Sequence, residues 1–209
     1  MEFAQLKSNL KKDFNGLKTK LKVALLGDTP TQLLKQALKG YGYEVAVDFE
    51  IFEADFDQID QQILDPTSEL YQSESDYIVI FASVQKVQLK FYKKPLEKRK
   101  DFASEYIDYV RHLANTIHDN TTARIILFNF PEINDSVFGN FSNKTEMSFI
   151  YQLRKINLSL MDLSRNVKNL FINDWNAEKT SPSHSEIEIH GSSIKHWEFR
   201  RIIDDNFNN

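Results

Sequence analysis

A turn at residues 27–29 combines three residue types that could do chemistry. Gly27, Asp28 and Thr29 directly follow an apolar run, so a carboxylate and a hydroxyl stand at its end. At the end of a parallel strand, this order places a nucleophile beside backbone N–H groups that can stabilise an oxyanion. Neither a Walker loop nor a dinucleotide-binding fingerprint occurs in the chain. Thr29 is therefore a candidate nucleophile with Asp28 beside it, and Gly27 is a candidate ligand contact.

The same turn also has a purely structural interpretation, which the sequence favours. Thr29 stands where a helix N-cap is expected, Pro30 suits the first helical position, and Gln32 lies three residues past the cap. In that case the Thr29 hydroxyl accepts a hydrogen bond from a backbone N–H. The helix that follows is expected to end at Gly40 or Gly42.

Five apolar runs of strand length could position such residues. They alternate with segments of helical periodicity and lie near residues 21–27, 43–52, 77–82, 124–130 and 167–172. This alternation predicts an α/β fold with a doubly wound parallel sheet of five strands. Because ligands bind at the carboxyl ends of such strands, we add three further candidate ligand contacts: Ser83, Asn129 and Asp174.

The two ends of the chain differ from this central part. Apolar residues at helical spacing predict a leading amphipathic helix within residues 1–20. Residues 177–209 are rich in Ser, His, Asp and Asn, and we expect a loosely packed polar extension there. The predicted organisation is a leading helix at 1–20, an α/β domain at 21–176 and a C-terminal extension at 177–209.

Composition excludes several classes of protein. The chain has 209 residues, which fit one domain, and no cysteine, which removes disulfides, thiolate metal sites and cysteine nucleophiles. A net charge of −4 gives no general attraction to nucleic acid or anionic lipid. No run approaches the roughly 20 apolar residues of a membrane span. We expect a cytoplasmic protein that binds neither nucleic acid nor membrane and holds no metal.

Charge is distributed unevenly along the chain. Eleven acidic residues and no basic one fall between Glu44 and Asp76, whereas seven basic residues and one acidic residue fall between Lys86 and Lys100. Such runs usually face solvent. The alternative is a basic patch for a phosphate-bearing ligand or an acidic carrier partner, with Phe91 and Tyr92 inside it.

Four segments carry a further signal: residues 22–34, 65–71, 76–80 and 169–174, of which Asp-Pro-Thr-Ser-Glu-Leu-Tyr at residues 65–71 is the most specific. In this order they resemble the SGNH-like N-terminal domain of FkbH-like proteins in the HAD phosphatase superfamily (subfamily IIIC). SGNH (GDSL-type) hydrolases are similar at the first turn but carry serine where this chain has Thr29. The resemblance spans about residues 21–176 and implies a three-layer, flavodoxin-like (SGNH-hydrolase-like) form of the sheet.

The resemblance also implies partners. FkbH-like proteins carry a downstream HAD domain that handles a phosphorylated three-carbon unit and, in antibiotic pathways, loads a glyceryl group onto an acyl carrier protein. That domain binds Mg²⁺ through an Asp-x-Asp-x-Thr motif, which this chain lacks. Residues 55–59 have two aspartates without the threonine, and we expect them in a loop away from any strand end. Mg²⁺ is thus expected only in an associated HAD domain, with that domain, a carrier protein or a phosphorylated small molecule as partner.

Three functions remain open. The first is a noncatalytic module that positions the substrate, the carrier protein or the HAD domain. The second is an active esterase or acyl transferase that uses Thr29, Asp28 and a tail histidine, although the Asp-x-x-His motif of SGNH hydrolases is missing. The third is a flavodoxin-like module that binds phosphate or another small ligand without covalent chemistry. The missing motifs favour the first function.

Overall fold

The structure, a computed structural model, describes residues 3–17, 19–133, 136–174, 187–189 and 192–194. Its main sheet has the strand order β2-β1-β3-β4-β5, and all neighbouring strands are parallel. This is the flavodoxin-like order, so the predicted fold class is confirmed. The strands are β1 (Thr19–Gly27), β2 (Val47–Glu53), β3 (Tyr77–Phe81), β4 (Arg124–Phe128) and β5 (Leu170–Asn173).

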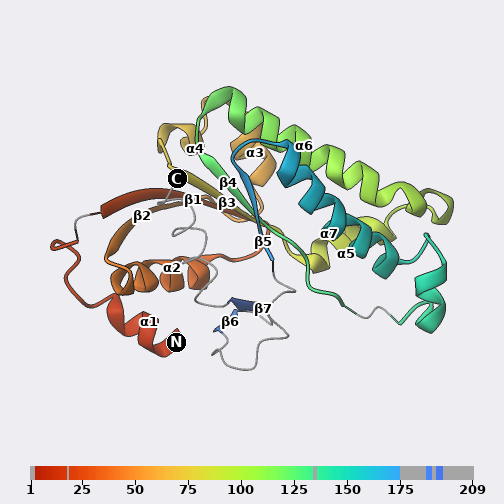
Figure 1. Cartoon of the computed structure of the whole chain (residues 1–209), viewed down its shortest axis with the longest axis horizontal. Helices are drawn as coiled ribbons and strands as arrows, with labels where there is room; N and C mark the ends of the chain where they lie inside the picture. The colour runs from red at the N-terminus through yellow and green to blue at the C-terminus, as the bar shows by residue number, and fades with distance from the viewer. Residues whose placement is uncertain (1–2, 18, 134–135, 175–186, 190–191, 195–209) are drawn as a thin grey trace.

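Helices cover both faces of this sheet (Figure 1). One face packs against α1 (Phe3–Asn9) and α2 (Gln32–Glu44). The other face packs against α3 (Ile59–Leu64), α4 (Glu69–Gln72), α5 (Val84–Tyr92), α6 (Phe102–Asn120) and α7 (Phe149–Asn166). Alternate residues of β1 serve the two cores: Leu25 faces α2, whereas Ala24 and Leu26 face the larger helical layer.

The central strand β3 is buried along its whole length. It pairs with β1 on one side and β4 on the other, and both of its faces are covered. This explains why residues 77–81 are apolar throughout instead of alternating with polar residues. The apolar run predicts such a buried strand, and the structure confirms it. Two short 3₁₀ helices, η1 (Leu96–Asp101) and η2 (Gly139–Lys144), precede α6 and α7.

The start and end of α2 differ from the prediction. The helix begins at Gln32 with Thr31 as its N-cap residue, so the expectation that Thr29 caps it is wrong. The Thr31 hydroxyl donates to Glu53 Oε1 at 2.6 Å, which ties the helix start to the end of β2. The N-cap therefore lies two residues later than the capping-box pattern predicts, because the turn after β1 is two residues longer than that pattern assumes.

The expected stop at Gly40 or Gly42 is also wrong, since α2 continues to Glu44. Both glycines permit close approach. A Cβ atom at Gly40 would lie 2.2 Å from the Leu6 carbonyl oxygen, and one at Gly42 would lie 2.4 Å from the Val47 carbonyl oxygen. These positions therefore let α1 and β2 pack directly against the helix backbone.

The chain ends also depart from the expected bounds. The leading helix α1 ends at Asn9, residues 10–17 form turns and irregular backbone, and β1 begins at Thr19. Asn9 Nδ2 donates to the Gly40 carbonyl oxygen at 3.1 Å and so fastens the end of α1 to α2. Most of the predicted extension at 177–209 lies outside the described residues, which include there only β6 (Ile187–Ile189) and β7 (Ser192–Ile194), an antiparallel pair.

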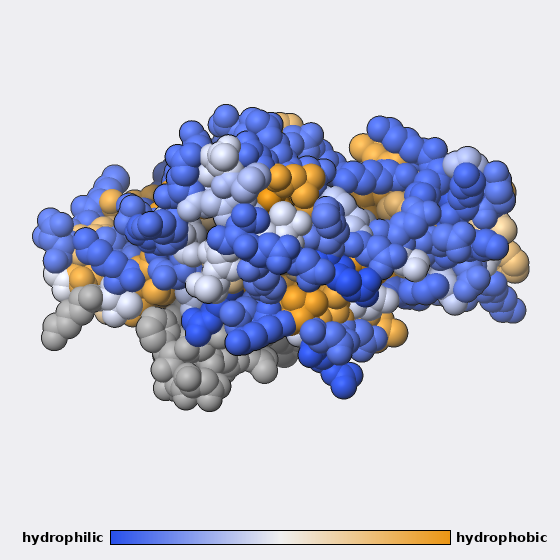
Figure 2. Space-filling model, turned by 90° about the horizontal axis from the view of Figure 1, so that it is seen from above, coloured by the Kyte–Doolittle hydropathy of each residue, from blue (hydrophilic) through white to orange (hydrophobic). Residues whose placement is uncertain are grey.

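The surface seen in Figure 2 is mainly hydrophilic, with separate apolar patches. No described helix is long and apolar enough to cross a membrane. Exposed apolar side chains include Phe56 and Leu89, which are 58% and 62% exposed.

Candidate functional site

The predicted polar residues gather at the carboxyl edge of the sheet, where parallel strands all end. Asp28 follows β1, Ser83 follows β3, Asn129 follows β4 and Asp174 follows β5. The Ser83 backbone N–H donates to Asp28 Oδ1 at 2.8 Å, and Asn129 Nδ2 donates to Asp174 Oδ1 at 2.5 Å. The four residues thus form two hydrogen-bonded pairs between neighbouring strands.

A cavity of about 310 Å³ opens at this edge, beneath α5 and α6. Its volume is at the lower end of the range for small-molecule sites. The charged lining residues come from the end of β1, the segment from β2 into α3, and α5: Asp28, Asp57, Asp60, Lys86, Lys90 and Lys93. Two tyrosines of α6, Tyr106 and Tyr109, also line the cavity.

Of the six candidate residues, Asp28 alone lines the cavity. Thr29 is half-buried, lies outside the lining, and its hydroxyl has no hydrogen-bond partner among the described residues. Gly27 lacks space for a side chain: its Cβ atom would lie 2.4 Å from Thr31 Cγ2 and 2.8 Å from the Thr29 carbonyl oxygen. Ser83 contributes its backbone N–H to Asp28, while its hydroxyl caps α5 by accepting from the Lys86 N–H.

Burial dominates the electrostatics of Asp28. Loss of solvent raises the pKa of its carboxyl group, while the Ser83 N–H and the nearby Lys86 and Lys90 ammonium groups oppose that rise. A buried carboxyl group with a raised pKa beside positive charges in a cavity is typical of functional sites. Asp28 is therefore the strongest candidate among the predicted residues.

The acidic wall of the cavity comes from the segment after β2. We expected residues 55–59 away from any strand end, and this is wrong because β2 continues to Glu53. The Asp57 N–H donates to the Gly27 carbonyl oxygen at 3.1 Å, which holds the segment against the end of β1. Asp57 has a φ of 62°, a left-handed conformation that aspartate tolerates. Its carboxylate pairs with Lys86 Nζ at 2.7 Å.

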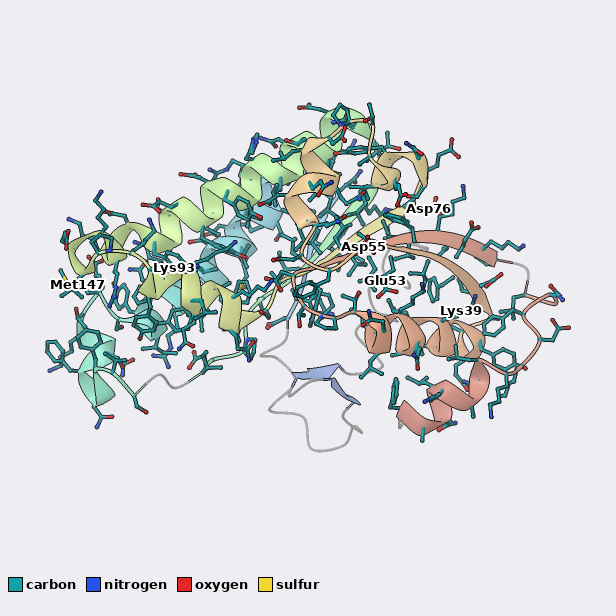
Figure 3. The ribbon with its side chains drawn as sticks, turned by 180° about the vertical axis from the view of Figure 1, so that it is seen from behind. Lys39, Glu53, Asp55, Asp76, Lys93 and Met147 are labelled. Carbon is teal, nitrogen blue, oxygen red and sulfur yellow. The ribbon has the colours of Figure 1, made fainter. Side chains whose placement is uncertain are left out.

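The basic wall comes from α5, where Lys86, Lys90 and Lys93 are four and three residues apart and so share one helix face. Lys90 Nζ lies 5.4 Å from the centre of the Tyr109 ring. Figure 3 labels Lys93 where α5 ends, well apart from Asp76, which precedes β3. Lys90 and Lys93 form no ion pair with any residue that the structure describes. Two positive charges of this wall are thus available to an anion.

Two other residues of the basic run, Lys94 and Arg99, have structural roles. Lys94 forms an ion pair with Glu105. The Arg99 guanidinium carbon lies 5.2 Å from the centre of the Phe91 ring and 4.9 Å from that of Tyr92. The run is therefore divided between packing and the cavity, which the sequence alone does not indicate.

The tyrosines stand between the charged wall and the interior. The Tyr109 hydroxyl donates to Asp60 Oδ1 at 2.5 Å. Burial, followed by the Asp28 and Asp60 carboxylates, raises the pKa of Tyr106 above its ordinary value, and burial and Asp60 do the same for Tyr109. Both phenols are therefore neutral near physiological pH. The Tyr109 proton is already donated to Asp60, so Tyr106 is the phenol that can donate to a ligand.

Five charged lining residues were not among the candidates: Asp57, Asp60, Lys86, Lys90 and Lys93. The one indication in the sequence was the acidic run followed by the basic run, because the fold brings the two face to face across the cavity. Within the described part of the chain, no group of three or more His, Cys, Asp or Glu side chains could hold a metal ion. The aspartates of the cavity are thus not assigned to Mg²⁺.

The fold and this cavity define a doubly wound α/β domain with a ligand-sized site at the carboxyl edge of its sheet. Residues 22–183 match the family model of the FkbH N-terminal domain, and the chain belongs to that family.

A solved structure is also similar to this chain. It is the N-terminal part of the protein BF1531 from Bacteroides fragilis, described as containing a phosphatase domain and complexed with Mg. The two share 40% sequence identity with a TM-score of 0.78. The match covers 85% of this chain and 46% of the other, so this chain corresponds to less than half of that structure. No curated protein sequence matches the chain.

Proposed function

We propose that this domain is a noncatalytic positioning module of an FkbH-like, HAD phosphatase-type protein, and that its cavity holds the anionic substrate. One observation carries the proposal: Lys90 and Lys93 line a ligand-sized cavity and form no ion pair with a described carboxylate. Family membership supports the same proposal, as does the phosphatase domain in the description of the similar structure.

The lining residues support a binding role rather than acyl transfer. Among the described residues that line the cavity there is no Ser, Thr, Cys or His, so no nucleophile and histidine base meet there. Thr29 lies at the same edge but outside the lining. The tail histidines of the esterase hypothesis, His184, His190 and His196, lie outside the described residues.

The substrate is expected to bring its own charge to the site. An anion would pair with Lys90 and Lys93 in charge-assisted hydrogen bonds, while the Tyr106 hydroxyl supplies a neutral donor. The phosphoryl chemistry and its Mg²⁺ are assigned to the HAD domain. The same proposal includes an acyl carrier protein as a second partner and an SGNH-like form of the fold. It also includes a cytoplasmic location, which the absence of cysteine suits.

A thermal-shift screen tests the proposal. Phosphorylated three-carbon acids, such as glycerate 3-phosphate, should raise the melting temperature in a saturable way, because a ligand that binds only the folded state stabilises it. Glycerol, which has no charge, serves as the control. A domain that acts purely as a scaffold would show no shift with any of these compounds, and that result would contradict the proposed binding role.

A further inference from the structure

The interior of the cavity is apolar, in contrast to its mouth. Behind the tyrosines the lining consists of aliphatic side chains from α6, β4 and α7: Val110, Leu113, Ala114, Ile125, Leu127 and Leu160. On α6, the first three lie three and four residues apart and therefore share the helix face toward the sheet. No charged residue accompanies these six at the inner end.

The cavity is also elongated. Its lining on α6 extends from Tyr106 to Ala114, which corresponds to about 12 Å of helix. On β4 it extends from Phe128 back to Ile125, about 10 Å of strand. Residues of α6 and of β4 share the larger of the two cores, so the lining follows both elements from the charged mouth inward.

Building on the proposed function, we propose that the cavity takes an amphipathic anion, with a carboxylate or phosphate at Lys90 and Lys93 and an aliphatic chain between the sheet and α6. A three-carbon phosphorylated acid alone has no apolar group to place against these side chains. Polar groups that enter such an interior without hydrogen-bond partners are disfavoured. An alkyl chain fits it, because each methylene leaves water for an apolar wall.

Calorimetric titration of the whole chain with butyl, hexyl, octyl and decyl phosphate tests the inference, and the matching alkanoates distinguish the two kinds of headgroup. Affinity should rise about fourfold for each added methylene, until the chain reaches the inner end of the cavity. Glycerate 3-phosphate is titrated in parallel. If it binds and chain length has no effect, the amphipathic ligand is wrong and the proposed function stands. If no anion binds, both are wrong.

A substitution at the inner end gives an independent test. Ala114→Leu places a larger side chain where the alkyl chain should end, so octyl phosphate should lose at least about fivefold in affinity while butyl phosphate is unaffected. Ala37→Leu is the matched control, because Ala37 is equally buried but lies in the other core, against α2. Equal losses in the two variants would contradict the inference. If A114L does not fold, the chain-length series of the unmodified protein decides alone.

Discussion

The Ser83 backbone N–H donates a hydrogen bond of 2.8 Å to Asp28 Oδ1, and this contact joins the ends of β3 and β1 at the mouth of the cavity. Asp28 is 9% exposed, so its carboxyl group has exchanged most of its water for this one N–H and the neighbouring lysines. The contact explains how Asp28 can be buried on the cavity wall, because one of its carboxyl oxygens accepts a hydrogen bond there.

We expect Asp28→Ala to lower the free energy of unfolding by about 1–3 kcal/mol, because the Ser83 N–H loses its acceptor. Asp28→Asn keeps an acceptor oxygen and should cost less than half as much. Denaturant unfolding measures both values. Asp55→Asn is the control, since Asp55 is exposed and should change stability by no more than about 0.5 kcal/mol. Equal losses in D28A and D28N would show that the hydrogen bond is unimportant.

The raised pKa of Asp28 makes stability depend on pH. The folded state favours the protonated carboxyl group, so its contribution is present below the ordinary value of 3.8 and is lost as pH rises through the raised pKa. D28N has no such titration. Its stability relative to the unmodified protein should therefore improve as the pH rises from the ordinary carboxyl value of 3.8 through the raised pKa of Asp28. A difference that stays constant, or that changes in the opposite direction, would argue against a buried, titrating Asp28.

The turn after β1 should accept no side chain at Gly27. We expect Gly27→Ala to destabilise the fold by about 1–3 kcal/mol, because its Cβ atom would overlap both Thr31 Cγ2 and the Thr29 carbonyl oxygen. Gly16→Ala is the control, since no atom lies within 4 Å of the corresponding position. Thermal unfolding compares the two. The close approach at Gly27 would be refuted by equal melting temperatures.

A clamp on the backbone of Phe130 supports the far wall of the cavity. The Phe130 N–H donates to Asn157 Oδ1 at 2.9 Å, and Asn157 Nδ2 donates to the Phe130 carbonyl oxygen at 2.8 Å. Asn157→Ala should cost about 2 kcal/mol of stability, because both backbone groups lose their partners. Asn166→Ala, at an exposed end of α7, is the control. A loss in N157A no larger than that in N166A would contradict the clamp.

Thr29 offers a test of the esterase hypothesis. The unmodified chain should hydrolyse short-chain esters no faster than Thr29→Ala, and both should bind glycerate 3-phosphate equally, because Thr29 does not line the cavity. A chromogenic ester assay measures the first comparison. Hydrolysis that disappears in T29A would overturn the noncatalytic role.

Much of the fold could be predicted because its periodicities are strong. The run at residues 77–81 indicated a buried central strand, and the alternation of strands and helices indicated which residues lie at the carboxyl edge of the sheet. The bounds of α2 could not be predicted, because Gly40 and Gly42 serve close packing with Leu6 and Val47, partners that only the fold brings near.

The sequence indicated the edge of the sheet where the cavity lies, but only one of the charged residues that line it. Asp28 follows a strand, so the rule for strand ends found it. Lys90 and Lys93 lie within and after a helix, and Asp60 lies in the first turn of another, so that rule could not find them. Their common position depends on how α3 and α5 pack around the cavity, which no local pattern encodes.

Isothermal titration of glycerate 3-phosphate tests the binding role most directly. The unmodified chain should bind one molecule, and Lys90→Met with Lys93→Met should weaken that binding by at least about tenfold, because each charge-assisted hydrogen bond contributes about 1.5–3 kcal/mol. Lys98→Met with Lys100→Met removes the same charge from residues of η1 outside the lining and should leave affinity unchanged. Absence of binding to the unmodified chain, or equal weakening in the two double variants, would contradict a ligand site at this cavity.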